Sequence, residues 1–418
     1  MKQINRHHNF DWITITIYMV LVLGGLMSIY SASLNMGDNN IYSLNNPYSK
    51  QIVFIFISAI SAFLILKIDG KFIAKIGYLI YALSIISLIL VLFIGKEVGG
   101  AKAWFDFGAF GIQPAEFAKF GTIMALAKYI HDKDIYLDKV RDLLNVTNII
   151  LIPVLFILLQ PDAGSALVFG SLIIMFFREG FPLKYVLIFL IIGIISLMTL
   201  IVGAPNTITI IVLLAMTLGF ILIKHKKRII SSLLFLIFGA LIVSLVEFSY
   251  NNILQSHQRE RIDIILNKEN NSLGSGYNLN QSLIAIGSGG FAGKGYLNGT
   301  QTKFNFVPEQ NTDFIFCTVG EELGFLGCIL ILSLFLALII RLIVLSEKQT
   351  SRFSRVTGYS LVSILFAHIF INISMTIGLL PVIGIPLPFF SYGGSSLISF
   401  SILLFTFIKL DACRMERF

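Results

Sequence analysis

Charged side chains are scarce in this sequence. Only 13% of its 418 residues are Asp, Glu, Lys or Arg, whereas 56% are hydrophobic. Soluble domains usually carry about 25% charged residues, so this composition excludes a soluble enzyme of this length. Cysteine is also rare, and the three present fall at Cys317 and Cys328 in an apolar run and at Cys413 in the tail. This odd number at scattered positions predicts neither a disulfide framework nor a metal cluster.

The sequence contains many long apolar runs. Runs of about 17–25 apolar residues, long enough to cross the hydrocarbon core of a bilayer, recur from end to end. The period-two alternation of barrel strands is absent. The sequence therefore predicts an all-α, polytopic transmembrane helical bundle forming one integral-membrane domain over 1–418. We expect about twelve spans, at residues 12–33, 52–68, 72–95, 114–130, 147–160, 163–177, 184–202, 206–223, 229–247, 313–340, 357–377 and 393–409.

The lysines and arginines orient this bundle. With the N-terminus inside, most of the 31 basic residues fall on cytoplasmic segments, in agreement with the positive-inside rule. Both termini are therefore expected inside, and 248–312 is expected to form a long extracytoplasmic loop. No small-residue cleavage site follows the first span, so that span is expected to be retained. The net charge of +8 is not clustered on one soluble domain, so nucleic acid is not an expected partner.

The end of the long loop delivers one carboxylate, Asp313, to the mouth of a span. One interpretation places this acid at a helix N-terminus that Asn311 or Thr312 caps. The other makes it a catalytic base that faces a water-filled cavity. Asp313 taken alone favours the first interpretation.

A second pair of charges lies at the start of the fourth span, Gln113–Lys119. Pro114 suits the first helical turn, because its missing N–H would have no partner there. Glu116 and Lys119 are three residues apart and so share one helix face. An isolated charge near the bilayer centre costs about 2.5–3.5 kcal/mol, which a pair facing the bundle largely avoids. The pair is either a structural ion pair or part of a charged cavity for an anionic substrate, and we favour the cavity.

Other polar stretches carry weaker signals. Gly287–Gly295 lacks the spacing of a Walker loop and is either a tight turn or a lipid-phosphate contact made through Lys294. Gln160-Pro161-Asp162 breaks a helix, and Asp162 is expected to cap the next one. Trp104 belongs to an aromatic patch that anchors the outer interface or stacks on a sugar or lipid.

Two further stretches lie on the outer side. Arg259 and Arg261 depart from the positive-inside trend, and they are either solvated or able to clamp a pyrophosphate. Pro386–Ser395 is expected to be a non-helical re-entrant hairpin, which is tolerated only against protein or water.

Together these stretches resemble the SEDS family of glycosyltransferases, which act in shape, elongation, division and sporulation. The matching residues keep the family's order and cover most of the chain. They are Trp104, Gln113–Lys119, Gln160–Asp162, Gln258, Arg259, Arg261, Gly274, Gly276, Tyr277, Gln281, Ser282, Ala285–Gly290, Gly293–Gly295, Gly299–Gln301, Pro308, Glu309, Thr312–Phe316, Gly320–Glu322, Gly324 and Pro386–Ser395. Gly299-Thr300-Gln301 favours the elongation (RodA) branch over the division (FtsW) branch.

The chain also departs from the family pattern. The family usually has ten spans, and 184–247 reads as three spans in place of one, so 184–223 is expected to be an extra span pair. Asn271-Ser272 stands where the family often has Asp-Pro, which leaves Asp313 as the carboxylate that matches the proposed catalytic position. Ala103 replaces a common Arg, and Ala115 replaces a common Ser.

The resemblance implies a peptidoglycan glycosyltransferase that polymerises lipid II into glycan strands during cell elongation. It would act at the extracytoplasmic face of the bacterial cytoplasmic (inner) membrane, with lipid II, membrane lipids and a class B penicillin-binding protein (a transpeptidase) as partners. Asp313 would be the general base or the ligand of a divalent cation, Mg²⁺ or Mn²⁺, with Glu116 and Lys119 as further catalytic residues. The substrate-binding residues would be Trp104, Gln113, Arg259, Arg261, Lys294, Gln301, Glu309 and Ser391.

Two other functions are compatible with this sequence. A lipid II flippase would use the same charged cavity without chemistry and would need polar groups along its whole path. The polar groups here crowd towards the outer face, which favours an enzyme. A non-catalytic scaffold for a penicillin-binding protein would tolerate the loss of Asp313 and Lys119.

Overall fold

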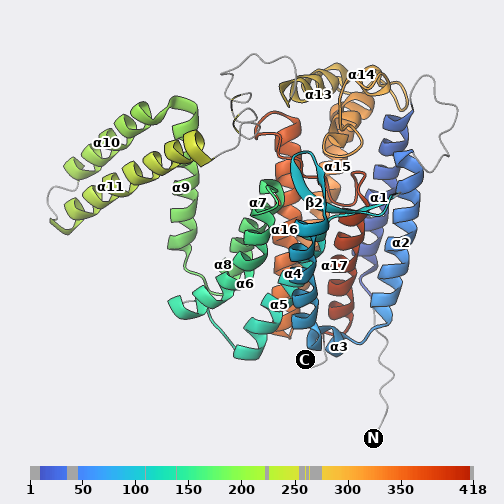
Figure 1. Cartoon of the computed structure of the whole chain (residues 1–418), viewed down its shortest axis with the longest axis horizontal. Helices are drawn as coiled ribbons and strands as arrows, with labels where there is room; N and C mark the ends of the chain where they lie inside the picture. The colour runs from blue at the N-terminus through green and yellow to red at the C-terminus, as the bar shows by residue number, and fades with distance from the viewer. Residues whose placement is uncertain are drawn as a thin grey trace, which may run out of the picture. The chain divides into compact units, whose positions relative to one another are not determined.

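Figure 1 shows the computed structural model of the chain. It describes residues 10–34, 46–108, 110–137, 139–221, 226–253, 259, 263 and 275–414. Two compact units divide the chain, one made of Met1–Phe181 with Tyr277–Phe418 and the other of Pro182–Gly276. A single domain over 1–418 and an extra span pair at 184–223 stay predictions.

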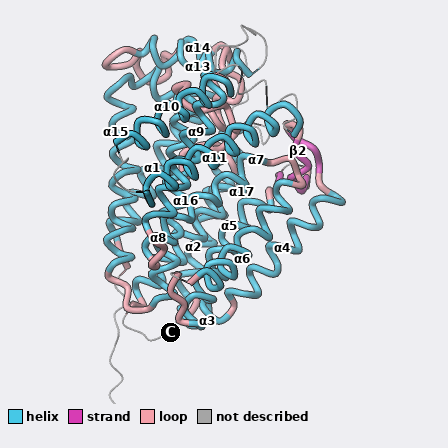
Figure 2. Tube along the Cα trace, turned by 90° about the vertical axis from the view of Figure 1, so that its left-hand side faces the viewer, coloured by secondary structure: helices cyan, strands magenta, loops and turns pink. Residues whose placement is uncertain are grey.

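The first unit is a helical bundle with a small sheet near one end (Figures 1 and 2). The almost wholly buried α16 and α17 lie at its centre, whereas α2 and α4 bury only one face. Its elements are α1 (Trp12–Ser33), α2 (Pro47–Lys67), α3 (Gly70–Lys75), α4 (Gly77–Ile94), β1 (Lys96–Val98), β2 (Ala101–Asp106), β3 (Gly111–Ile112), α5 (Pro114–Lys133), α6 (Val140–Leu158), α7 (Ala163–Phe169), η1 (Gly170–Leu172), α8 (Ile173–Arg178), most of α13 (Ser275–Gly289), α14 (Thr300–Lys303), α15 (Ile315–Glu347), α16 (Arg352–Thr376) and α17 (Gly394–Ala412).

Different elements and contacts mark the two ends of this bundle. At one end, which we call the terminal end, Asp11 before α1 pairs with Arg341 of α15, and Gln349 donates to Asp411 of α17 at 2.7 Å. Burial alone would raise the pKa of Asp11, but hydrogen bonds from Arg341 and Thr14 lower it below its usual value. At the opposite end, the loop end, lie α13, α14 and the sheet of β1, β2 and β3 (Figure 1).

The all-α membrane fold predicted from the sequence is confirmed. Nine helices within the described ranges are long and apolar enough to cross a membrane. The other three predicted spans correspond to α5, to the broken segment Ala163–Arg178, and to α10 (Ala204–Ile221), whose described apolar stretch is short. The total of twelve crossings and the inside location of both termini stay predictions.

Several element boundaries differ from those expected. The helix expected at 147–160 is α6, which begins at Val140. The antiparallel strands β1, β2 and β3 were not expected in this chain, and they fold the 96–112 connection into a small sheet. The long tenth span extends to Glu347 and contains a kink at Gly324, where the backbone leaves the helical region.

A glycine-rich loop fills the kink in α15. The amide groups of Lys294 and Gly295 donate to the carbonyl oxygens of Glu321 and Glu322 at 3.0 and 2.9 Å. Phe325 in turn donates its amide to the carbonyl of Gly290 at 3.0 Å. The loop therefore supplies partners to backbone groups that the interrupted helix cannot pair. This geometry supports the tight-turn interpretation for 290–295, whereas Gly287–Gly289 end helix α13. A phosphate contact by Lys294 stays a prediction.

Replacing Gly293 by Ala is expected to destabilise the protein by about 3 kcal/mol or more. A Cβ at Gly293 would lie 2.1 Å from the Glu322 carbonyl oxygen, and its φ of 80° disfavours any L side chain. The control is Gly287→Ala in α13, where a Cβ meets nothing within 4 Å. Thermal unfolding in detergent checks this, and equal melting temperatures for the two variants contradict it.

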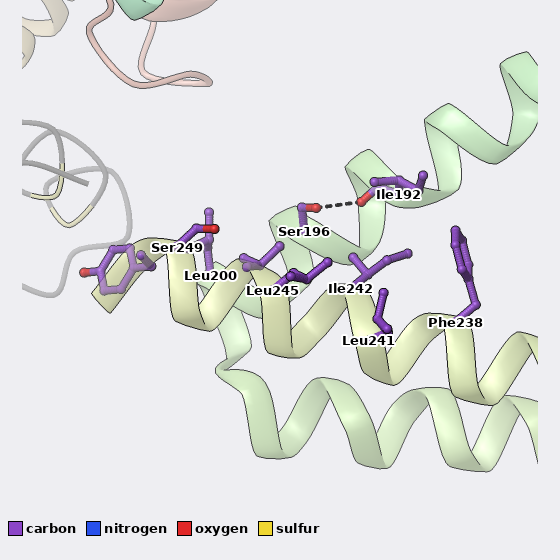
Figure 3. A pocket seen from close by; sticks show the side chains of 10 residues that line it. Ile192, Ser196, Leu200, Phe238, Leu241, Ile242, Leu245 and Ser249 are labelled. Carbon is purple, nitrogen blue, oxygen red and sulfur yellow. Dashed lines mark hydrogen bonds between the residues drawn. The ribbon is translucent and has the colours of Figure 1, made fainter. Parts of the chain in front are cut away.

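The second unit consists of α9 (Leu183–Val202), α10, α11 (Lys226–Phe248) and the π-helical turn Ser249–Ile253. Ile195, Ala204, Ile211, Ile242 and Val243 form its apolar core. A groove of about 430 Å³ between α9 and α11 is lined almost wholly by apolar side chains (Figure 3). Its one drawn hydrogen bond, from Ser196 Oγ to the Ile192 carbonyl, lies within α9. The polar groups in its lining are the hydroxyls of Ser196, Ser249 and Tyr250, and none of the lining residues is charged.

Candidate active site

The first turns of α5 place two opposite charges inside the bundle. Pro114 occupies the start of the helix, as expected. Glu116 and Lys119 are only 3% and 2% exposed, and Lys119 Nζ lies 2.7 Å from Glu116 Oε1. Glu116 Oε2 is buried without a hydrogen-bond partner. The expected ion pair is thus present, and it leaves one anionic oxygen unsatisfied.

A histidine from α16 completes this charged cluster, by which we mean Glu116, Lys119 and His368. Lys119 Nζ lies 2.8 Å from His368 Nε2, and His368 Nδ1 lies 3.2 Å from the Pro386 carbonyl oxygen. Because a carbonyl only accepts, Nδ1 must carry the hydrogen, and Nε2 then accepts from the ammonium. The ring of Phe400 also faces Lys119 Nζ, at 5.0 Å from its centroid.

Asp313 is half-buried and lies beside the segment that reaches His368. A Cβ built on Gly384 would be 3.3 Å from Asp313 Oδ2, so this carboxylate lies beside the open face of Gly384, two residues before Pro386. One turn along α16 from His368, Asn372 Nδ2 donates to the carbonyls of Asp313 and Ile385 at 2.8 and 2.7 Å. Helix α16 and the 384–386 segment therefore join Asp313 to the charged cluster.

The helix cap that was expected from Asn311 or Thr312 does not position Asp313. Helix α15 begins at Ile315, and its N-cap residue is Phe314 with no side-chain cap. Thr312 Oγ1 instead donates to Glu309 Oε2 at 2.8 Å. The capping role predicted for Asn311 or Thr312 is therefore wrong, because a turn over 309–314 separates both residues from the helix.

The hairpin expected at Pro386–Ser395 is non-helical as far as Gly393, but its last two residues belong to α17, which begins at Gly394. The non-helical backbone also extends back to residue 377. Tyr392 donates its amide to the Asn311 carbonyl at 2.9 Å, and Ser391 Oγ accepts from the Leu387 amide at 2.9 Å. Phe389 is buried at a φ of 65°, which is rare for a bulky residue, and its ring packs on Phe400. The segment is thus held against both the loop before α15 and the aromatic ring over Lys119.

Other residues predicted for the site contact one another at the start of α5, just before Glu116 in the sequence. Gln113 donates its amide to Ser395 Oγ at 3.0 Å and its side-chain Nε2 to Asp162 Oδ2 at 2.9 Å. Asp162 caps α7 through the Ser165 amide, as expected. The starts of α5, α7 and α17 therefore converge through polar side chains at the loop end.

A buried carboxylate on α15, Glu321, organises the loop before it. Lys294 Nζ and the amides of Thr300, Gln301 and Thr302 all donate to Glu321 at 2.7–3.0 Å. The expected substrate contacts Lys294 and Gln301 thus share a partner. The Gln301 side-chain Oε1 is buried without a hydrogen bond.

The remaining predicted residues have other partners. Glu309 is exposed in the turn before Asp313, with a φ of 57°. Trp104 lies on β2, and its ring covers Gly111 at 3.1 Å from a built Cβ. Arg259 belongs to the second unit, where its Nη2 donates to the Asn251 carbonyl at 2.6 Å. Arg261 lies outside the described residues.

The described residues do not form a ready-made binding site for a divalent cation. In the part of the chain that the structure describes, no three His, Cys, Asp or Glu side chains are grouped to hold a metal ion. Magnesium is often held by one or two carboxylates together with substrate phosphates. The residues present therefore fit a cation only if Asp313 shares it with a phosphate-bearing ligand.

The chain is similar to known proteins over most of its length. The FtsW/RodA/SpoVE family model, described as a cell cycle protein, matches residues 11–205 and 196–414. The chain belongs to this family. It is 30% identical to peptidoglycan glycosyltransferase RodA of Treponema pallidum (strain Nichols), over 93% of this chain and 94% of that protein. It is 32% identical to peptidoglycan glycosyltransferase MrdB of Escherichia coli (strain K12), over 76% of this chain and 73% of that protein.

Solved structures agree with this membership in the FtsW/RodA/SpoVE family. A chain from a peptidoglycan synthase complex that coordinates polymerization and crosslinking superposes with a TM-score of 0.73 at 25% identity. The match covers 98% of this chain and 99% of that one. The multi-pass helical fold of the family therefore extends over almost the entire chain.

Sequence reasoning missed four residues that hold this FtsW/RodA/SpoVE site together. They are His368, Asn372, Glu321 and Gln310, and each is buried and bonded to a segment distant in sequence. Gln310 Nε2, for example, donates to the carbonyls of Ala32 and Thr302 at 2.8 Å. Polar residues within apolar runs are the signal that was available, because such groups in a membrane helix need a partner.

Replacing Asn372 by Leu is expected to slow the reaction by about tenfold or more and to destabilise the protein by about 1–3 kcal/mol. The variant leaves the Asp313 and Ile385 carbonyls without their common donor. Asn206→Leu is the control, because that exposed amide donates to the Val202 carbonyl, only four residues earlier, at the end of α9. Turnover below the melting temperature of both variants checks this, and equal turnover contradicts the positioning role.

Proposed function

We propose that this chain is a peptidoglycan glycosyltransferase that polymerises lipid II into glycan strands. The observation that carries the assignment is the position of the half-buried Asp313, whose carbonyl is held by Asn372 on the same helix as His368 and whose carboxylate lies beside Gly384. The named relatives support the same reaction class over nearly the full length of the chain. By the positive-inside rule, the loop end faces the extracytoplasmic side of the bacterial cytoplasmic membrane.

In the proposed reaction, Asp313 accepts the proton of a sugar hydroxyl on the acceptor. That oxygen then bonds to the anomeric carbon of the donor, while the bond from this carbon to the polyprenyl pyrophosphate breaks. A positioned base of this kind contributes about 10²–10⁴-fold to such a step. Gly384 beside Asp313 Oδ2 leaves the space over this carboxylate without a side chain.

The cations take different parts in this proposal. Lys119 is buried against Glu116 and His368, so in this structure it acts on Asp313 through its charge. Direct contact of Lys119, Lys294, Arg259 and Arg261 with the pyrophosphate stays a prediction. So does a divalent cation, Mg²⁺ or Mn²⁺, held by Asp313 together with the pyrophosphate.

A transpeptidase partner is part of the proposal. One relative of known structure comes from a complex that coordinates polymerization with crosslinking. We propose that a class B penicillin-binding protein binds this chain in the same way and passes the new strands to crosslinking. The partner would bind through span surfaces and not through Asp313.

Purified lipid II tests the proposal. The protein is incubated with lipid II in detergent, with and without the cognate transpeptidase, and glycan strands are separated on a gel. Polymer made in the absence of any other polymerase supports the enzyme. In a parallel experiment, transfer of lipid II between the leaflets of liposomes without polymer formation would establish the flippase and refute the glycosyltransferase.

A further inference from the structure

A polar pocket lies in the first unit, at the ends of its lining helices that are far from Asp313. It has a volume of about 210 Å³. Helix α3 forms one wall, the last turns of α5 form another, and Phe353 at the start of α16 forms the floor. The start of α16 and the end of α5 are at the terminal end, whereas the charged cluster belongs to the opposite halves of both helices. The pocket therefore takes no part in the chemistry proposed above.

The charge lining this pocket is mostly positive. Lys71 and Lys75 of α3 face Lys128 and His131 of α5 across it, and Asp132 is the one acidic residue in the described lining. Lys128 Nζ is 3.5 Å from Asp132 Oδ2, so one of the three ammonium groups is offset. The nearby Asp69 caps α3 through the Lys71 amide and does not line the pocket. Two uncompensated lysines thus remain for an anionic ligand.

Neighbouring packing holds the pocket in shape. Gly77 at the start of α4 lies against α5, where a Cβ would be 3.1 Å from the Met124 carbonyl and 3.5 Å from Lys128 Cδ. The stem of Lys128 is therefore fixed by the α4–α5 contact. Phe353 is fully buried and gives the pocket a rigid apolar floor.

Exposed aromatic residues of α3 and α4 neighbour two of the lysines that line the pocket, and we call them its aromatic border. Phe72, next to Lys71, is 52% exposed, and Tyr78 is 41% exposed. Lys128 Nζ lies 5.5 Å from the centroid of the Tyr78 ring. Cations beside exposed aromatic rings at the end of membrane helices are typical of the headgroup level of a bilayer. Basic pockets between helix ends on the cytoplasmic side bind anionic lipid headgroups.

We propose that this pocket binds the phosphate of an anionic phospholipid. Lys71, Lys75 and Lys128 supply the positive charge, and His131 supplies a hydrogen-bond donor. Phe72 and Tyr78 contact the upper part of the acyl chains. The ligand chemistry is a phosphate group, and the aromatic border identifies its source as a lipid headgroup and not free phosphate.

Native mass spectrometry of the purified full-length protein tests this site. The protein is titrated with phosphatidylglycerol, with phosphatidylcholine of the same acyl chains, and with inorganic phosphate as competitor. We expect saturable binding of phosphatidylglycerol that exceeds binding of phosphatidylcholine and resists millimolar phosphate. Lys71→Gln/Lys75→Gln should weaken that binding by about tenfold or more, because each lysine adds about 1 kcal/mol near an anionic surface.

A matched control removes the same charge elsewhere. Lys96→Gln/Lys102→Gln changes two lysines of the sheet region at the loop end, and this variant should bind as the wild type does. Lys71→Arg/Lys75→Arg keeps the charge and should retain binding. Equal weakening by both Gln variants, equal binding of the two lipids, or full displacement by phosphate would each overturn the proposal. None of these outcomes depends on glycan synthesis, so the proposal stands or falls separately from the proposed function.

Discussion

Purified protein carrying Asp313→Asn is expected to polymerise lipid II at least about 100-fold more slowly than the wild type. Asparagine keeps the size of the side chain and its place beside Gly384 but cannot accept the hydroxyl proton. The fold should be unaffected, because Asp313 is half-buried and α15 begins without its help. Product formation on a gel under single-turnover conditions gives the rate.

Asp106→Asn is the control for this experiment. Asp106 is an acid on β2 that pairs with Lys96 at 2.7 Å in an exposed setting, and it lies outside the proposed site. Its variant should polymerise at the wild-type rate. Wild-type polymerisation by Asp313→Asn would show that this carboxylate is not the base, although the protein would still be a polymerase.

Replacing Lys119 by Met is expected to destabilise the protein by about 3–5 kcal/mol and to abolish polymerisation. The variant leaves the Glu116 carboxylate buried, with the ammonium at 2.7 Å removed and its second oxygen already unpaired. His368 also loses the donor to its Nε2. Thermal unfolding and polymerisation are measured on the same preparation.

The double variant Glu116→Gln/Lys119→Met separates stability from chemistry. Removing both charges should restore most of the melting temperature, because a neutral pair leaves no uncompensated charge. Polymerisation should stay lost, since the charge behind Asp313 is absent. Lys96→Met, which breaks an exposed pair, should change stability by at most about 1 kcal/mol. A double variant that polymerises at the wild-type rate would mean that the Glu116–Lys119 pair is purely structural.

Much of this fold follows from local sequence. The first span was expected at 12–33 and is found at Trp12–Ser33, because apolar length is read directly from composition. The Glu116–Lys119 pair followed from helical spacing, and the Asp162 cap followed from its neighbouring proline. These features depend on neighbours in sequence, which periodicity and capping rules describe well.

The features that sequence reasoning missed depend on segments distant in sequence. Helix α16 is buried on nearly every side, so its apolar pattern has no preferred face, and the polar residues His368 and Asn372 within it do not reveal which distant segments they contact. Glu321 finds Lys294 across a connection of 27 residues, and the pairing depends on the kink at Gly324. The short strands β1 to β3 carry too few residues for a recognisable alternation.

The Glu116–Lys119 pair comes from a single helix, and this affects how the protein is made. During synthesis α5 enters the bilayer well before α16 has left the ribosome, so His368 is not yet there to help. Each charge alone would oppose insertion by about 2.5–3.5 kcal/mol. Because the two partners are one helical turn apart, α5 can neutralise itself as soon as it coils. If one partner were on another helix, the folded protein could contain the same ion pair. Helix α5 would then still carry an unpaired charge when it enters the membrane during synthesis.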